Sequence, residues 1–379
     1  MRDQASFLDS RNRVWWLFVA VSSIVSPLSA IFSQQVQSTL DPRLIPVGKC
    51  STELVISMVD LIVVGAGPSG LSCAIAAKQN GLTAVVLEKG SLVDAIRRFP
   101  TNLVWFSTPE LLEIGGVPFV LSTVRPTRIE TLAYYQKVAQ HHGLEVRSFD
   151  AVQSMVRKDE IFRITTEHNN LYEGRNVVVA TGYFDNPNHI QVEGESLPNV
   201  MHYYDEPYRC FGCNVAVVGG RNSAVEAALD LFRHGARVTL IHRGEKLSEG
   251  VKYWILPDIQ NRIKAKEIRA CFSSTVREIR ENSIVVNADG GTGEFPNDFT
   301  FVLVGFHPDT ALLERFGVQI NPDTQGPCYD EKTFETNVPG LFVAGSIVAG
   351  RYNNKVFVEN GRLHGAIVIS SILSHRSTS

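Results

Sequence analysis

The 379-residue sequence predicts an α/β fold with two Rossmann-like domains. Residues 61–90 and 214–247 share one order of features, namely an apolar run, a glycine-rich turn, a helical segment and a second apolar run. This order is typical of a nucleotide-binding βαβ unit. With 44% hydrophobic and 20% charged residues, the chain is expected to form two globular domains. A net charge of −3 and the lack of a basic run argue against a nucleic-acid partner.

The first stretch carries the G-x-G-x-x-G turn of dinucleotide-binding proteins. The apolar run Leu61–Val64 predicts a buried strand, and the turn that follows contains Gly65, Gly67, Pro68, Ser69 and Gly70. Gly65 allows the tight turn, Gly67 lets a pyrophosphate approach the backbone, and Gly70 lets the helix pack closely. We expect free N–H groups of the helix N-terminus and the Ser69 hydroxyl to donate to that anion.

The second apolar run of this unit ends in an acid. Glu88 follows that run directly and is itself followed by Lys89. At this distance from the first glycine of the turn, dinucleotide-binding proteins place an acid that accepts a hydrogen bond from a ribose hydroxyl. Glu88 and Lys89 are therefore candidate cofactor-binding residues.

The second stretch differs from the first in ways that predict a different nucleotide. Arg243 follows Gly219 at nearly the same distance at which Glu88 follows Gly65. A carboxylate would repel a 2′-phosphate, whereas Arg binds phosphate, so this unit is expected to bind NADPH. Arg221 replaces the middle glycine, and Arg243 could alternatively be a solvated strand-end charge. The candidate binding residues are Gly219, Gly220, Asn222, Ser223, Ala224, His242, Arg243 and Lys246.

Two more apolar strands end in small residues. One runs into Thr181-Gly182, and the other ends at Ala344-Gly345 and is followed by Ser346. Residues 356–373 then have the composition of a helix.

The order of these motifs resembles thioredoxin-reductase-like flavoproteins, and their detail resembles the bacillithiol disulfide reductase family. The stretches that carry this resemblance are Phe99–Phe119, Tyr253–Gln260, Val304–Ile320 and Phe357–Gly365. The resemblance implies that the first unit binds FAD, with Thr181, Gly182, Gly345 and Ser346 close to the flavin-bearing nucleotide. It also implies a split FAD domain, at 58–205 and 308–379, with the NADPH domain inserted at 206–307.

The resemblance implies an enzyme that passes electrons from NADPH through FAD to a small disulfide. That family usually carries cysteine where this chain has Ser69, and serine cannot exchange with a disulfide. Two alternatives stay open. A flavin monooxygenase also needs two dinucleotide sites, although the spacing from Gly194 to His202 is twice the spacing that class expects. A flavin-bound NADPH sensor or electron-transfer protein would tolerate both the missing cysteine and Arg221.

The sequence does not single out a catalytic residue. Ser69, His364, Cys210 and Cys213 are the candidates, with His364 as a proton donor to a leaving thiolate. The Cys210-Phe211-Gly212-Cys213 run has redox spacing, but it abuts the strand that enters the second turn and does not lie at a helix start, which would lower the pKa of a thiol. No metal site is expected, because no second cysteine pair completes four ligands.

The leader at 1–57 differs in composition from the rest of the chain. Its segment 14–32 is apolar and follows two arginines, as in a signal peptide or a membrane anchor. We favour a translation start at Met58 and a cytoplasmic enzyme, because NADPH must be available to it. The expected partner is the small-molecule disulfide, with further copies of the chain in a homo-oligomer and a membrane only if the leader is real.

Overall fold

The computed structural model describes residues 55–288, 290–352 and 355–377. The predicted leader at 1–57, with its apolar segment 14–32, lies outside these residues apart from 55–57, which are the first residues of strand β1 (Val55–Val64). In the described ranges, no helix combines the length and the apolar character that crossing a membrane requires.

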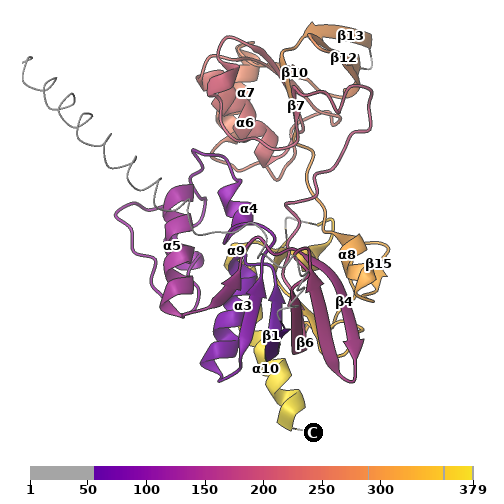
Figure 1. The fold of residues 1–379 in the computed structure, drawn as a ribbon. Helices are drawn as coiled ribbons and strands as arrows, with labels where there is room; N and C mark the ends of the chain where they lie inside the picture. The colour runs from indigo at the N-terminus through magenta and orange to yellow at the C-terminus, as the bar shows by residue number, and fades with distance from the viewer. Residues whose placement is uncertain (1–54, 289, 353–354, 378–379) are drawn as a thin grey trace, which may run out of the picture. The chain divides into compact units, whose positions relative to one another are not determined.

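The first sheet has seven strands, and the first glycine-rich turn follows its strand β1. Figure 1 labels β1, β4 and β6 of this sheet. Its order is β3-β2-β1-β6-β5-β4, and β17 pairs with β6. The strands besides β1 are β2 (Ala84–Leu87), β3 (Glu145–Arg147), β4 (Val152–Lys158), β5 (Ile161–Thr166), β6 (Leu171–Val179) and β17 (Leu341–Val343). Strands β3, β2, β1, β6 and β17 are parallel, whereas β4 and β5 are antiparallel to their neighbours.

Parallel register brings three motifs to one edge of this sheet. Val64 is level with Val179 of β6, and Val343 of β17 is level with the same residue. The amide of Ala180 donates to the Val64 carbonyl, and the amide of Ala344 donates to the Val179 carbonyl. The glycine-rich turn, Thr181-Gly182 and Gly345-Ser346 therefore begin side by side.

Both faces of the first sheet are covered. Leu61 and Val63 pack with α3 (Pro68–Gln79), α5 (Arg128–His141) and α10 (His364–Ser377), whereas Ile62 and Val64 pack with residues of α8 (Thr310–Arg315). This alternation is that of a strand buried on both faces, as the apolar run predicts.

The helix expected over 356–373 is wrong as a single element. The structure has α9 (Val358–Gly361) and α10, separated by a turn at residues 362–363. The hydroxyl of Ser72 in α3 donates to the Arg362 carbonyl at 2.5 Å, and Gly365 packs directly on Ser72. Close packing on α3 accounts for the position of the break.

The second sheet has five parallel strands in the order β10-β9-β8-β14-β7. They are β7 (Val200–Met201), β8 (Asn214–Val218), β9 (Arg237–Ile241), β10 (Arg269–Cys271) and β14 (Phe299–Val302). Helices α6 (Asn222–Arg233) and α7 (Leu256–Lys264) cover one face. The other face packs on an antiparallel sheet of β11 (Thr275–Ile279), β12 (Ser283–Ala288) and β13 (Gly291–Pro296).

The chain path confirms an α/β fold in which one Rossmann-like unit is inserted into another. The chain leaves the first sheet after β6, forms the second sheet, and returns to the first with β17. Strand β7 pairs within the second sheet although it precedes the boundary expected at residue 205. The remaining short elements are α4 (Asp94–Arg97), β15 (Ile320–Asn321), β16 (Gly326–Pro327), η1 (Pro109–Leu111), η2 (Tyr208–Cys210) and η3 (Gly345–Ala349).

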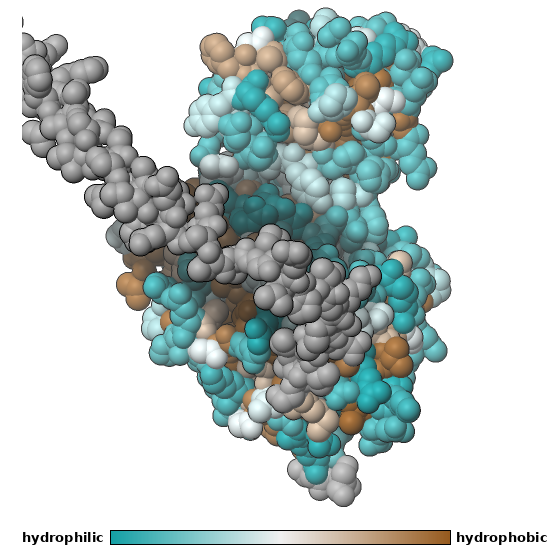
Figure 2. Space-filling view, viewed as in Figure 1, coloured by the Kyte–Doolittle hydropathy of each residue, from teal (hydrophilic) through white to brown (hydrophobic). Residues whose placement is uncertain are grey.

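Hydrophilic side chains cover most of the described surface on the face that Figure 2 shows, with apolar residues scattered between them. Exposed apolar residues of this scattered kind are ordinary for a globular protein.

Candidate functional site

The first glycine-rich turn has the geometry expected for its glycines. Gly65 has φ +107°, and a Cβ on it would lie 2.6 Å from the Ala180 carbonyl oxygen. A Cβ on Gly70 would lie 2.0 Å from the Gly65 carbonyl oxygen. A side chain at Gly65 is therefore disfavoured by the positive φ and also blocked by the Ala180 carbonyl. The lack of a side chain at Gly70 lets α3 begin against the end of β1.

Gly67 differs from its two neighbours because it is open on one side. It is the N-cap of α3, with φ −72° and Pro68 at the start of the helix. A Cβ on Gly67 would meet no described atom within 4 Å. This opening beside the free N–H groups of a helix N-terminus fits the close approach of a pyrophosphate.

Ser69 lies where the separate motifs meet. Its Oγ would be 2.6 Å from a Cβ on Gly345 and 2.9 Å from a Cβ on Gly361 of α9. The start of α3 thus packs against both late segments of the chain, which places Ser69 within the candidate FAD site.

Glu88 is held beside the turn by backbone donors. Its Oε2 accepts from the Ala66 amide at 2.7 Å and its Oε1 accepts from the Gly90 amide at 2.8 Å. Burial raises the pKa of this carboxyl, and the two backbone hydrogen bonds partly offset that rise. Each oxygen keeps a lone pair for a further donor, so the carboxyl can also accept from a ribose hydroxyl.

The Thr181-Gly182 and Gly345-Ser346 motifs face each other. A Cβ on Gly182 would lie 3.3 Å from the Ser346 Oγ. The Thr181 Oγ1 is buried and has no hydrogen-bond partner among the described residues. A buried hydroxyl without a partner, at the edge where three motifs meet, fits a polar group of a bound FAD.

His364 begins α10 and lies behind Gly345. Its Nδ1 accepts from the Gly345 amide at 3.1 Å, and its ring centroid is 4.2 Å from that of Phe334. Burial lowers the pKa of His364 to about 4. The imidazole is therefore neutral near pH 7, and its proton lies on Nε2, the one atom from which it could donate.

The structure has an ion-pair network beside Glu88 that the sequence did not predict. Asp185 pairs with Lys89 at 2.8 Å through Oδ2 and with Arg98 through Oδ1, and Arg98 also bonds Asp94 at 2.7 Å. Burial alone would lower the pKa of Arg98, but the two carboxylates raise it further than burial lowers it. The only signal was the position of Asp185, shortly after Thr181.

The second glycine-rich turn has the same construction with different side chains. Gly219 has φ +147°, and a Cβ on it would lie 2.5 Å from the Leu303 carbonyl oxygen. Arg221 is the N-cap of α6 with φ −108°, a conformation open to any residue, and its side chain is exposed. The Asn222 side-chain Nδ2 donates to the Gly250 carbonyl at 3.0 Å, and the Asn222 Oδ1 accepts from the backbone amide of Lys252 at 2.9 Å. Arg221 thus fits the middle position because its side chain turns to solvent.

The residues after β9 present positive charge to solvent. Arg243 is exposed and has no hydrogen bond or ion pair to the described residues. His242 packs against Gly220, and burial together with Arg243 lowers its pKa. Lys246 pairs with Glu249 at 3.1 Å on the surface. A guanidinium at this strand end is available to a 2′-phosphate.

The remaining residues of this turn are placed differently from one another. Ala224 is fully buried and its methyl group packs against Gly219, as a small residue at the third glycine position should. Ser223 is exposed at the start of α6.

The two cysteines with redox spacing lie in the second unit. Cys210 is fully buried in the core that packs on α6, and burial raises its pKa to about 11. Cys213 is half-buried, and its thiol donates weakly to the Phe211 carbonyl at 3.7 Å. A thiol with a raised pKa is a poor nucleophile, because only the thiolate attacks a disulfide.

Each of the two glycine-rich turns follows a parallel strand of its own sheet, and the late motifs flank the first turn. This arrangement defines a flavoprotein with two dinucleotide-binding domains. A family model for pyridine nucleotide-disulphide oxidoreductases matches residues 62–345, and the chain belongs to this family. It is 41% identical over 314 residues to the bacilliredoxin reductase Bdr of Bacillus subtilis (strain 168), a match that covers 82% of this chain and 96% of that protein.

Solved structures give the same result. The bacillithiol disulfide reductases Bdr (YpdA) from Bacillus cereus and Staphylococcus aureus are 40% and 37% identical to this chain, each with a TM-score of 0.82. They cover 84% and 85% of this chain, and 99% and 100% of their own lengths. The chain is thus a flavoprotein disulfide reductase with FAD and NADPH as its cofactors, and the monooxygenase alternative is not favoured.

Proposed function

We propose that this enzyme reduces the symmetric disulfide of a small cellular thiol of the bacillithiol type. The balanced reaction is NADPH + H⁺ + RSSR → NADP⁺ + 2 RSH. The observation that supports it is identity of about two fifths along nearly the whole length of a bacilliredoxin reductase and of two bacillithiol disulfide reductases. FAD, when bound, accepts two electrons from NADPH and makes them available to the disulfide.

In this proposal the residues of the first sheet bind and orient the flavin nucleotide. Gly67 leaves room for the pyrophosphate, Ser69 donates to it, and Glu88 accepts from the ribose. Thr181 and Ser346 offer hydroxyls to the flavin-bearing part, and His364 keeps Gly345 in place through its Nδ1. In the second unit, Arg243 binds the 2′-phosphate of NADPH.

Ser69 and the two cysteines bear on how the disulfide is reduced. A serine hydroxyl cannot form a mixed disulfide, and the Cys210 thiol is buried with a raised pKa. We therefore infer that neither Ser69 nor the cysteine pair attacks the substrate, and that the chain's part is to position the two cofactors and the disulfide. A cytoplasmic location follows from this proposal, because the enzyme needs a supply of NADPH.

An anaerobic assay tests the substrate. The FAD-loaded enzyme is mixed with NADPH and either bacillithiol disulfide or glutathione disulfide, and absorbance reports the NADPH consumed. We expect turnover with the first disulfide and at least tenfold less with the second. Equal rates would contradict the thiol assignment. If NADPH is oxidised only when the assay is repeated in air, the protein would be an oxidase or a sensor.

A further inference from the structure

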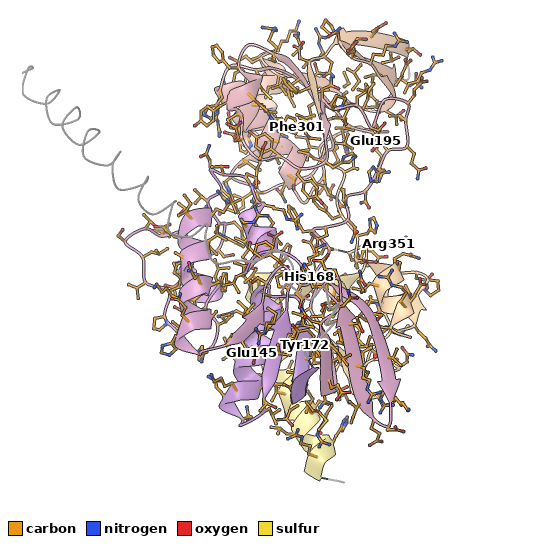
Figure 3. All side chains as sticks on the ribbon, viewed as in Figure 1. Glu145, His168, Tyr172, Glu195, Phe301 and Arg351 are labelled. Atoms are coloured by element: carbon orange, nitrogen blue, oxygen red, sulfur yellow. The ribbon has the colours of Figure 1, made fainter. Side chains whose placement is uncertain are left out.

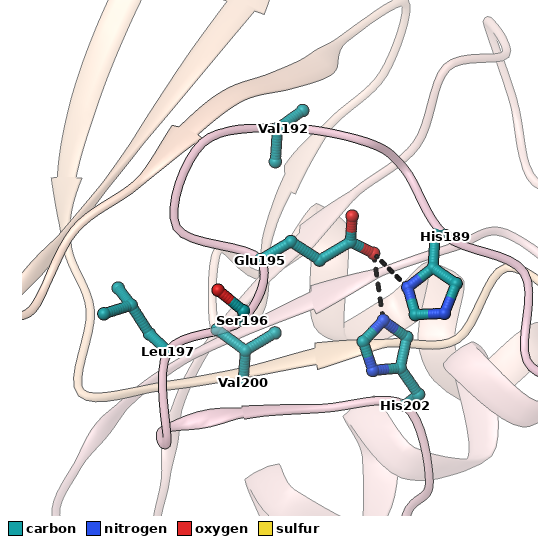
Figure 4. Close-up of a pocket in the computed structure, with 7 residues that line it drawn as sticks. All are labelled: His189, Val192, Glu195, Ser196, Leu197, Val200 and His202. Atoms are coloured by element: carbon teal, nitrogen blue, oxygen red, sulfur yellow. Dashed lines mark hydrogen bonds and ion pairs between the residues drawn. The ribbon is translucent and has the colours of Figure 1, made fainter.

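Three side chains that can bind a metal converge on the segment that precedes β7. His189 Nδ1 lies 3.2 Å from Glu195 Oε1, and His202 Nε2 lies 2.9 Å from the same oxygen (Figure 4). One ligand atom from each residue can be chosen so that all three atoms lie within 4.8 Å of one another. The centroids of the two imidazole rings are 4.5 Å apart and the rings are tilted by 57°. One nitrogen of each ring faces the carboxylate (Figure 4).

The backbone holds this arrangement in place. Glu195 also accepts from the amides of Ile190 and Gln191, at 3.0 and 2.7 Å, which fixes its carboxylate across its own loop. The loop is pinned to β11, because Ile279 donates its amide to the Glu193 carbonyl and a Cβ on Gly194 would overlap the Ile279 carbonyl.

The two histidines are anchored at separate points. His202 directly follows β7, which pairs with β14 in the second sheet. His189 follows Asn188, whose amide donates to the Gly305 carbonyl at 2.9 Å. Preorganised ligands reduce the conformational entropy that binding an ion would cost.

The surroundings suit a transition metal. Glu195 and His202 are mostly buried, whereas the His189 side chain is 56% exposed and leaves a route for the ion and for water. The three side chains line a pocket together with Val192, Ser196, Leu197 and Val200, and the apolar members of this lining limit the access of solvent to the ligands. Two imidazoles favour Zn²⁺ and similar ions over Mg²⁺ and Ca²⁺, which prefer oxygen ligands.

We propose that His189 Nδ1, His202 Nε2 and a Glu195 carboxylate oxygen bind one Zn²⁺-type divalent ion, with water completing four-coordination. Three protein ligands and one water is an established zinc geometry. The ion would tie residue 189 to residue 202, and so brace the chain between the first sheet and β7. None of these residues belongs to either glycine-rich turn, so we assign the ion no part in the electron transfer. Its water-bound position is open, as in catalytic rather than structural zinc sites.

Calorimetry on the full-length, tag-free, FAD-loaded enzyme tests this site. We expect one Zn²⁺ bound per chain, and affinity reduced by roughly tenfold to a hundredfold or more in Glu195→Gln and His202→Ala. Mg²⁺ should give no comparable binding. Zn²⁺ should raise the melting temperature of the wild type and leave that of these variants unchanged.

The matched control is His168→Ala. His168, labelled in Figure 3 in the part that contains the first sheet, also lies beside a buried carboxylate, with its Nδ1 3.3 Å from Asp150. Among the described residues it belongs to no group of three side chains that could hold a metal ion. This variant should bind Zn²⁺ as the wild type does. X-ray absorption at the zinc edge should show nitrogen and oxygen ligands without sulfur, which separates this site from the cysteine pair.

Three results would overturn the proposal. They are binding no tighter than millimolar, wild-type affinity in both Glu195→Gln and His202→Ala, and sulfur in the zinc coordination sphere. Glu195→Gln keeps one acceptor oxygen, which can serve the Ile190 or the Gln191 amide but not both, because these amides donate to different carboxylate oxygens. Circular dichroism and the melting temperature without Zn²⁺ show whether this variant is folded. Lost binding in a folded Glu195→Gln variant would support a ligand role.

Discussion

At the N-terminus of α3, Gly67 has room for a side chain and no backbone reason to be glycine. We expect Gly67→Leu to fold and to lose FAD, because the leucine would occupy the place of the pyrophosphate. The absorbance of the purified protein and the flavin released on denaturation measure the effect. Gly250→Leu is the control, since a Cβ there also lies in open surroundings, 3.8 Å from the nearest atom, and it should retain the flavin.

Arg243 should decide between the two nicotinamide cofactors. Arg243→Ala is expected to raise the KM for NADPH by roughly ten- to a hundredfold, because a charge-assisted hydrogen bond contributes about 1.5–3 kcal/mol. The KM for NADH should change little. Arg237→Ala, at the opposite end of the same strand, should leave both values near wild type. Equal effects of Arg243→Ala on both cofactors would refute the 2′-phosphate role.

His364 should make stability depend on pH in a defined direction. Its pKa is about 4 in the folded protein and near 6.5 when unfolded, so between these values the unfolded chain binds the proton. The contribution of His364 to the free energy of unfolding is therefore complete above pH 6.5 and is lost as the pH falls toward 4. Urea unfolding gives the free energy of unfolding at pH 7 and at pH 4.5. The decrease between these two pH values should be about 1 to 2 kcal/mol smaller in His364→Asn than in the wild type. His141→Asn, at an exposed histidine, should follow the wild type.

Among the elements, α10 depends on one glycine for its contact with α3. A Cβ on Gly365 would lie 2.6 Å from the backbone carbon and oxygen of Ser72. Gly365→Ala should therefore destabilise the protein by about 1–3 kcal/mol, although alanine favours helix. Ala366→Leu, one position further and exposed, should stay within about 0.5 kcal/mol of wild type in urea unfolding. A free energy of unfolding that is the same in Gly365→Ala as in the wild type would contradict the packing described for α10.

For the whole molecule, electrons should reach the substrate without the cysteine pair. The double variant Cys210→Ala with Cys213→Ser is expected to keep NADPH-dependent disulfide reduction within a few-fold of wild type, since the Cys210 thiol is buried and protonated. Stopped-flow measurement of flavin reduction by NADPH gives the internal control. Loss of turnover with normal flavin reduction would instead make the pair the catalyst.

The sequence by itself determined the two nucleotide-binding units and their order. Strand, glycine-rich turn, helix and terminal charge are set by residues close together in the chain, so Gly65 to Glu88 and Gly219 to Arg243 could be recognised locally. The resemblance then linked the late Gly345-Ser346 motif to the first unit. The prediction of a single helix over 356–373 was wrong, because the break between α9 and α10 depends on packing against Ser72, which is distant in the sequence.

Only the tertiary structure decided which separate residues meet. Parallel register of β1, β6 and β17 brings Gly65, Thr181 and Gly345 together, and burial in the second core gives Cys210 its raised pKa. No metal site was predicted, because neither a second cysteine pair nor a closely spaced histidine pair lies near Cys210 and Cys213 in the sequence. His189, Glu195 and His202 come together only when their loop packs on β11 and β7 joins the second sheet. Such contacts depend on strand pairing and burial between distant segments, which local patterns do not encode.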